Sequence, residues 1–145
     1  MLKIRPIERA DEPEWRRLWT GYLEFYEAAA SETVYATTFE RLFADGLYEP
    51  NGFLAFSEER AVGLVHYFQH RHCWHVENVI YLQDLFAAPE ARGLGVGRAL
   101  IEAVYAEADR LRLAGVYWTT AEDNAAARRL YDRIAKKTPF IKYQR

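Results

Sequence analysis

Residues 81 to 98, Tyr-Leu-Gln-Asp-Leu-Phe-Ala-Ala-Pro-Glu-Ala-Arg-Gly-Leu-Gly-Val-Gly-Arg, decide how this chain folds. The stretch opens inside an apolar run over residues 79–87, which is typical of a buried strand and which Pro89 closes. A glycine-rich loop follows, and residues 98–113 then repeat apolar side chains at helical spacing. A strand, a loop and a helix in direct succession predict an anion site, because the loop N–H groups meet the positive end of the helix there.

The glycine spacing narrows the kind of anion site. Gly93, Gly95 and Gly97 let the backbone come close to a ligand, and Arg92 and Arg98 flank them with positive charge. A dinucleotide fold would need G-x-G-x-x-G in its first strand-to-helix turn, and a nucleotide P-loop would need Gly-Lys-Ser/Thr. The chain has neither pattern, so the loop is predicted to bind phosphate in a different context.

The pattern on either side of this stretch predicts an α+β fold. Strands are expected at residues 2–7, 53–57, 62–71, 79–87, 116–120 and 140–143, and helices at residues 12–30, 37–44, 98–113 and 124–135. This order implies a mostly antiparallel central sheet with helices on both faces and one late strand-helix-strand crossover. The length of 145 residues fits a single domain over residues 1–145.

Composition excludes several classes of function. A net charge of −2 argues against nucleic-acid binding, and no apolar run approaches the ~20 residues of a membrane helix. The N-terminus lacks an apolar leader, and Cys73 is the only cysteine, so a reducing, cytoplasmic location is expected. Cys73 is interpreted as a small buried residue. The four histidines at positions 66, 70, 72 and 75 do not have the spacing of a metal site, and no metal is predicted.

Two motifs resemble those of the GNAT superfamily of N-acetyltransferases. Arg92-x-x-Gly95-x-Gly97 is similar to the family's Q/R-x-x-G-x-G/A acyl-CoA motif, and the strand at 116–120 with the helix from Asn124 to Tyr131 resembles its second conserved block. The sequence Tyr81-Leu-Gln-Asp-Leu-Phe most resembles the corresponding strand of diamine (polyamine) acetyltransferases and of related histone/polyamine enzymes. The resemblance implies a GNAT-like fold and direct transfer of an acetyl group from acetyl-CoA to a primary amine.

The resemblance also implies roles for particular residues. The backbone of Leu85 and Ala87 is expected to bind the pantetheine arm, with an N–H near Leu85 polarising the thioester carbonyl. Asn124 is expected to reach the same arm, and Tyr131 to protonate the departing thiolate as general acid. The pyrophosphate is expected on the loop N–H groups of Arg92, Gly93, Leu94, Gly95, Val96, Gly97 and Arg98. Tyr131 also falls on an apolar helix stripe, where a core tyrosine would look the same, and Asn124 also suits a helix cap.

The substrate side of the site is less clearly marked. Gln83, Asp84, Tyr26 and His66 are the expected substrate-binding residues. Gln83 stands where the polyamine enzymes carry a glutamate proposed as general base. Either a water chain, His66, Glu77 or Asp84 removes the ammonium proton, or the amine arrives already neutral. Asp84 either stabilises the fold or binds the substrate ammonium, and His66 is by default a satisfied core histidine. An aromatic wall for the amine is another possibility, formed by Tyr22, Tyr26, Tyr67 and Trp74.

The expected partner is a small-molecule amine, such as a polyamine or an amino acid. A protein-lysine acetyltransferase and a non-catalytic acyl-CoA-binding regulatory module are the alternatives, and the retention of Tyr131 favours the enzyme over the module. No nucleic-acid or membrane partner is expected, and a homodimer is left open.

Overall fold

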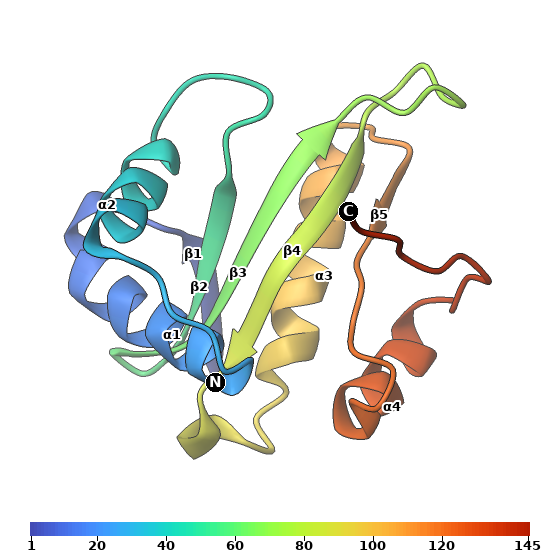
Figure 1. Ribbon diagram of the computed structural model, residues 1–145. Helices are drawn as coiled ribbons and strands as arrows, with labels where there is room; N and C mark the ends of the chain where they lie inside the picture. The colour runs from blue at the N-terminus through green and yellow to red at the C-terminus, as the bar shows by residue number, and fades with distance from the viewer.

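Five strands form one sheet in the order β1-β2-β3-β4-β5 (Figure 1). The computed structural model describes all residues from 1 to 145. The strands are β1 (Leu2–Pro6), β2 (Asn51–Ser57), β3 (Arg60–His70), β4 (Val79–Ala87) and β5 (Gly115–Tyr117). Neighbouring strands are antiparallel except β4 and β5, which run parallel. The expected α+β fold with a mostly antiparallel sheet is confirmed.

Helices cover both faces of the sheet. One face carries α1 (Glu12–Phe25) and α2 (Glu32–Arg41), and the other carries α3 (Val96–Arg110) (Figure 1). The last helix, α4 (Ala125–Ile134), follows β5, and two short 3-10 turns precede α1 and α3. No helix has both the length and the apolar composition needed to cross a membrane.

The two sides of the sheet bury separate apolar clusters. On the α1 side the largest fully buried side chains include Trp15, Leu18 and Leu64, and on the α3 side they include Leu100 and Val104. The α3 helix packs closely because β3 has Gly63 where the two elements meet. A Cβ at Gly63 would lie 2.3 Å from Cγ1 of Val96, so only glycine allows this approach.

A β-bulge interrupts β4 at Gln83. Asp84 pairs with His66 and Leu82 pairs with Tyr67, so Gln83 has no partner on β3. As a result Asp84 faces α1, where Trp19 contacts it, while Leu82 and Leu85 both pack towards α3. The bulge therefore aims a carboxylate at one side of the sheet and leaves Gln83 exposed beside it.

The last two strands diverge soon after they pair. Their register covers only Val79 with Gly115, Ile80 with Val116 and Tyr81 with Tyr117. From residue 82 to the end of β4, one edge of that strand has no partner strand. The space beside this free edge is where the cleft described below opens.

Several expected bounds differ from the observed ones. The strand expected at residues 140–143 is wrong, because residues after α4 form no regular structure. A strand needs a partner edge, and β5, the last strand in the sheet order, is only three residues long. The helix expected at 37–44 begins earlier, at Glu32, because the Ser31 side chain accepts a hydrogen bond from the N–H of Val34 and caps it. Cys73 is exposed, not buried as expected.

Candidate active site

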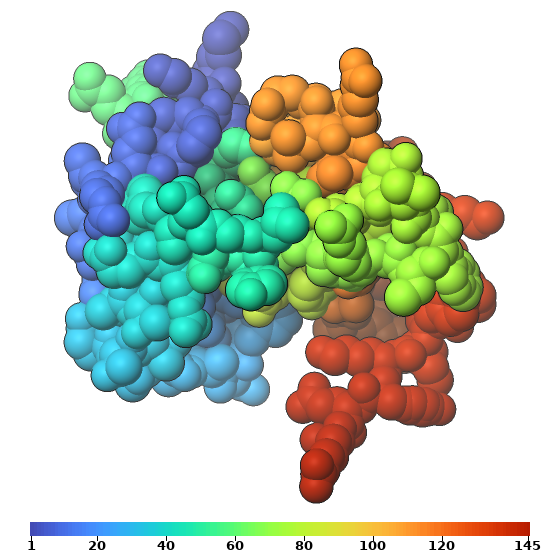
Figure 2. Space-filling model, turned by 90° about the horizontal axis from the view of Figure 1, so that it is seen from above, coloured from blue at the N-terminus to red at the C-terminus, as the bar shows by residue number.

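A cleft of about 280 Å³ lies along the free edge of β4. Its walls come from the end of α1, from β4, from the segment after β5, from α4 and from the C-terminal segment. Figure 2 shows the surface hollowed between the cyan N-terminal helices and the red C-terminal part of the chain. The lining residues are Tyr22, Tyr26, Tyr81, Leu82, Gln83, Asp84, Leu85, Trp118, Thr119, Thr120, Ala121, Tyr131 and Lys142.

Tyr131 lies in the second half of α4 and lines this cleft. Burial, and then the proximity of Tyr26, raise the pKa of the Tyr131 phenol to about 12. Desolvation has this effect because it disfavours the charged phenolate. The hydroxyl therefore keeps its proton at neutral pH and is able to donate it to a group in the cleft.

Asp84 forms the floor of the cleft and is held from below. Its Oδ2 accepts a hydrogen bond of 3.3 Å from Trp19 Nε1 and lies 2.9 Å from Nδ1 of His66. Nε2 of His66 in turn accepts a bond of 2.9 Å from Trp15 Nε1. His66 is only 3% exposed, so the structure puts it behind Asp84 and out of the cleft wall. Its burial with both nitrogens engaged agrees with the reading of His66 as a satisfied core histidine.

Two tyrosines at the end of α1 stand above this carboxylate. Burial, and next the negative charge of Asp84, raise the pKa of Tyr22 and of Tyr26. Both phenols are therefore neutral near Asp84 and present aromatic faces to the cleft, with their ring centroids 5.1 Å apart. Aromatic faces suit an organic cation.

The rest of the expected aromatic wall lies elsewhere. Tyr67 is buried in the core on the α3 side, and Trp74 is exposed in the loop between β3 and β4. Tyr81 and Trp118 take their places in the cleft. Glu77, one of the candidate bases, belongs to the same loop as Trp74 and does not line the cleft.

The glycine-rich loop forms a cradle of free N–H groups at the start of α3. Gly93 and Gly95 have φ values of +86° and +73°, and a Cβ at either position would meet nothing within 4 Å. Arg92 and Leu94 donate their N–H groups to the carbonyls of Pro89 and Ala91. The five other N–H groups of the loop donate no hydrogen bond within the protein, and they belong to Gly93, Gly95, Val96, Gly97 and Arg98.

This cradle fits a phosphate group. Free N–H groups at a helix start, with the positive end of the helix dipole behind them, favour an anion, and the open space above the glycines leaves room for it. The two flanking arginines differ: Arg98 bonds Glu102 at 2.6 Å, whereas Arg92 is exposed and forms no ion pair. Arg92 is therefore the side chain available to a bound anion.

Asn124 caps α4. Its side-chain oxygen accepts a bond of 3.4 Å from the N–H of Ala127, and its amide donates to Thr120 at 3.4 Å. The residue does not line the cleft, although Thr120 does. Asn124 therefore fixes the start of α4 and contacts the segment before it, whose Thr120 lines the cleft.

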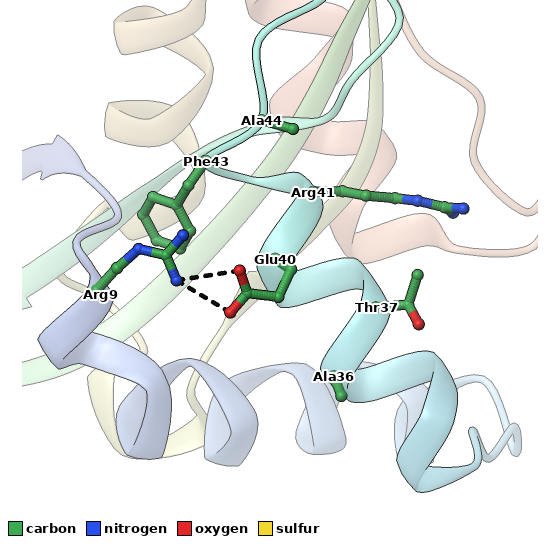
Figure 3. A pocket seen from close by; sticks show the side chains of 7 residues that line it. All are labelled: Arg9, Ala36, Thr37, Glu40, Arg41, Phe43 and Ala44. Carbon is green, nitrogen blue, oxygen red and sulfur yellow. Dashed lines mark hydrogen bonds and ion pairs between the residues drawn. The ribbon is translucent and has the colours of Figure 1, made fainter.

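A second hollow lies on the outer side of α2 and carries no comparable chemistry. It is lined by Arg9, Ala36, Thr37, Glu40, Arg41, Phe43 and Ala44 (Figure 3). Arg9 and Glu40 already neutralise each other at 2.9 Å, and Arg41 points away from them. No group of three or more His, Cys, Asp or Glu side chains comes together in a way that would hold a metal ion.

Seven of the thirteen lining residues were not among the expected site residues, and three of these, Tyr81, Trp118 and Lys142, bring aromatic or charged groups to the cleft. Tyr81 was quoted only as part of a motif, and Trp118 only as part of a strand. Lys142 is exposed on the C-terminal segment and lies in no periodic pattern. Only the three-dimensional path of that segment brings Lys142 to the cleft.

Comparisons with known proteins agree on one family. Residues 13–135 match the model of the acetyltransferase (GNAT) family. The D-amino-acid N-acetyltransferase HPA3 of Saccharomyces cerevisiae is 42% identical over 144 residues, covering 98% of this chain and 89% of the yeast protein.

Solved structures share the fold at low identity. The aminoglycoside acetyltransferase AAC(6')-Iy, in complex with the bisubstrate analog CoA-S-monomethyl-acetylneamine, superposes with a TM-score of 0.84 at 19% identity, covering 100% of this chain and 97% of the other. A ribosomal-protein-alanine N-acetyltransferase from Brucella melitensis gives a TM-score of 0.79 at 19% identity, covering 99% and 98% of the two chains.

Proposed function

Because this chain belongs to the acetyltransferase (GNAT) family and transfers an acetyl group from acetyl-CoA to a primary amine of a small molecule, its acceptor is the open question. We propose that the acceptor is a free D-amino acid. The comparisons give no support to a non-catalytic acyl-CoA-binding module. The acceptor class is supported by the yeast relative, whose name states activity on D-amino acids. It is also supported by the cleft itself, as the next paragraph argues.

The cleft carries one charge of each sign, and this observation favours an amino acid over a polyamine. Asp84 is the only acid among the lining residues, and Lys142 is the only base. A zwitterion offers an ammonium group to the first and a carboxylate to the second. A polyamine is cationic at each amine and would meet Lys142 as a like charge.

The proposed division of labour follows from the same residues. The free N–H groups of the glycine-rich loop, with Arg92, hold the pyrophosphate of acetyl-CoA, and the free edge of β4 at Leu85 and Ala87 holds its extended arm. Acetyl-CoA supplies the acetyl group as a reactive thioester. The Leu85 backbone N–H polarises the carbonyl, and Tyr131 Oη protonates the departing sulfur.

The protons balance in this scheme. The ammonium nitrogen of the acceptor loses two protons and forms one bond to the acetyl carbon, while the carbon–sulfur bond of the thioester breaks. One of them replaces the proton that Tyr131 gives to sulfur, and the other leaves to solvent. Gln83 and Tyr26 are assigned to the amine by their exposure to the cleft, beside Asp84.

An amine panel tests the acceptor class. Thiol release from acetyl-CoA is measured with the D and L enantiomers of one amino acid, a diamine, an aminoglycoside and a lysine peptide. The D enantiomer should give the largest kcat/KM, and the L enantiomer is its matched control because the two differ only in handedness. A diamine or peptide that is acetylated more efficiently than either enantiomer would refute this acceptor.

Lys142→Gln tests the carboxylate contact by itself. The KM for the D-amino acid should rise about tenfold, since one unscreened ion pair near a protein surface contributes on the order of 1 kcal/mol or more. The KM for the corresponding amine without a carboxylate should stay the same. An equal rise for both compounds would show that Lys142 does not contact the carboxylate.

Three further properties are part of the proposal. A homodimer is supported by the exposed apolar side chains of Phe140, Ile141 and Tyr143, which are 79%, 77% and 79% exposed. Function without nucleic acid is supported by the net charge of −2. A cytoplasmic location is supported by the exposed, unpaired thiol of Cys73, which suits a reducing compartment. Sedimentation equilibrium would measure the first of these directly.

A further inference from the structure

The hydrogen bond from Trp15 to His66 determines where the histidine carries its proton. An indole N–H only donates, so Nε2 of His66, 2.9 Å from Trp15 Nε1, must be the acceptor and carry no proton. A neutral imidazole has one N–H, which is then on Nδ1. Nδ1 lies 2.9 Å from Oδ2 of Asp84, so His66 donates and Asp84 accepts.

Asp84 is therefore a hydrogen-bond acceptor with one oxygen already used. Its Oδ2 takes the bonds from His66 and Trp19, no bond of standard geometry ends on Oδ1, and the Tyr22 phenol lies near enough to the carboxylate for a hydrogen bond with Asp84 to contribute to its raised pKa. The only fully buried side-chain N or O atom without a partner is Oδ1 of Asn78. Oδ1 of Asp84 therefore still has access to solvent, and the opening available to it is the cleft that Asp84 lines.

Trp15 also prevents His66 from neutralising this charge. A second proton on His66 would have to go to Nε2, and the new N–H would point at the N–H of Trp15. Trp15 is 0% exposed and packs against Trp19 and Phe39, with ring centroids at 5.3 and 5.1 Å, and this packing holds its ring in place. A histidine–aspartate pair without this tryptophan would become a charge-neutral ion pair once the imidazole took up a proton.

We infer that Trp15 and His66 are positioning residues that keep Asp84 as a net negative charge with Oδ1 free for the acceptor's amino group. The inference rests on the proposed function, since it assigns the amine of that reaction to Asp84. The charge draws the ammonium into the cleft. After the amine loses a proton, Oδ1 accepts a hydrogen bond from one of its N–H groups. This bond turns the nitrogen lone pair towards Leu85 and Tyr131.

The groups that face Asp84 set the background for any pH measurement. Tyr22 and Tyr26 face it from α1, and His66 faces it from β3. Tyr81 lies on the same strand, while Tyr131 and Lys142 face the cleft from α4 and the C-terminal segment. A ratio of variant to wild type at each pH cancels the titration of the substrate and of the groups that both proteins share.

The first measurement needs no substrate. The ring nitrogens of His66 are observed by 15N NMR in the wild-type protein from about pH 5.5 to 9, which spans the range where free imidazole titrates. The expected result is a neutral ring protonated on Nδ1 at every pH. A wild-type His66 that gains a proton on Nε2 within this range would overturn the inference.

The second measurement uses Trp15→Phe, which keeps an aromatic ring and removes the N–H. The KM for the best amine in the panel, divided by the wild-type KM, should rise about tenfold from the alkaline to the acidic end of the range, as His66 becomes protonated and cancels the charge of Asp84. A ratio that is the same at every pH would mean that Trp15 only fills space, and would overturn the inference.

The matched control is the double variant Trp15→Phe with His66→Gln. Glutamine keeps a donor and an acceptor but does not titrate, so the pH dependence of the ratio should disappear. A ratio that still depends on pH would assign the effect to another group and count against the proposed role of Trp15 and His66. Should Trp15→Phe fail to fold, the wild-type NMR result decides. If no amino acid in the panel is acetylated but His66 stays neutral and protonated on Nδ1, the acceptor class is refuted. The proposed role of Trp15 and His66 is then unaffected.

Discussion

Trp118 meets the ring of Tyr131 edge to face, with centroids 5.3 Å apart and planes at 68°. One residue follows β5 and the other lies on α4, so this contact joins two walls of the cleft. This contact uses the ring of Tyr131 and leaves its hydroxyl, which forms no hydrogen bond within the protein, free to reach into the cleft.

Removal of the Tyr131 hydroxyl alone tests its role as proton donor. Tyr131→Phe keeps the ring and its contact with Trp118, so kcat should fall by ~10²-fold while acetyl-CoA affinity stays nearly intact. Tyr105→Phe is the matched control, since its hydroxyl bonds the carbonyl of Ile134 outside the cleft. Wild-type turnover in Tyr131→Phe would make Tyr131 a packing residue only.

A carboxylate at Gly95 should exclude the phosphate. Gly95 has a φ of +73°, which Asp and Asn both tolerate better than other side chains, so these two replacements differ mainly in charge. By calorimetry, Gly95→Asp should weaken acetyl-CoA binding by about tenfold or more relative to Gly95→Asn. Equal affinity in the two variants would mean that the pyrophosphate does not bind at this loop.

Gln83→Glu tests whether a carboxylate base is missing from β4. The new acid would stand next to Asp84 along the strand, so it should change kcat/KM little or weaken amine binding through like-charge repulsion. The measurement is the pH profile of kcat/KM for wild type and variant with the best amine. A gain of about tenfold or more across the neutral range would instead identify Gln83 as the position of a lost base.

Alkaline pH should destabilise the folded chain. Burial raises the pKa values of Tyr22, Tyr67 and Tyr131 above the ~10 of an unfolded tyrosine. Below pH ~10 these phenols are protonated in both states and have no effect. Above it the unfolded chain releases protons first, so the free energy of unfolding should fall as the pH rises.

Denaturant unfolding at several pH values measures this fall. Tyr67→Phe keeps the buried ring and removes one titrating phenol. Its free energy of unfolding should therefore decline less steeply above pH ~10 than that of the wild type. Parallel declines would show that Tyr67 does not contribute.

The sequence predicts the features that depend on residues close together along the chain. The strand at 79–87 was predicted with its observed bounds, and the loop and the helix after it followed from glycines and helical spacing. Gln83, Asp84, Leu85, Tyr26 and Tyr131 were expected near the substrate or the thioester, and all of them line one cleft. Their expected roles came from the resemblance to the GNAT superfamily motifs, and periodicity added only which face of an element is apolar.

Features that depend on distant contacts were missed. The place of His66 behind Asp84 depends on Trp15 and Trp19, which lie 51 and 65 residues from their partners. The absence of a strand at 140–143 depends on the short edge of β5, and the position of Lys142 depends on the path of the same segment. Nothing within a short window of sequence encodes any of these three.

The bulge at Gln83 makes β4 two half-strands that are out of phase with each other. Before it, even-numbered residues such as Ile80 and Leu82 face α3, and after it the odd-numbered Leu85 does so. A regular strand in which Gln83 paired with β3 would therefore have one of two faults. Either Asp84 would turn into the apolar layer against α3, or Ile80 and Leu82 would turn out of it. A single residue without a strand partner is thus what lets one strand serve both as a wall of the core and as the floor of the cleft.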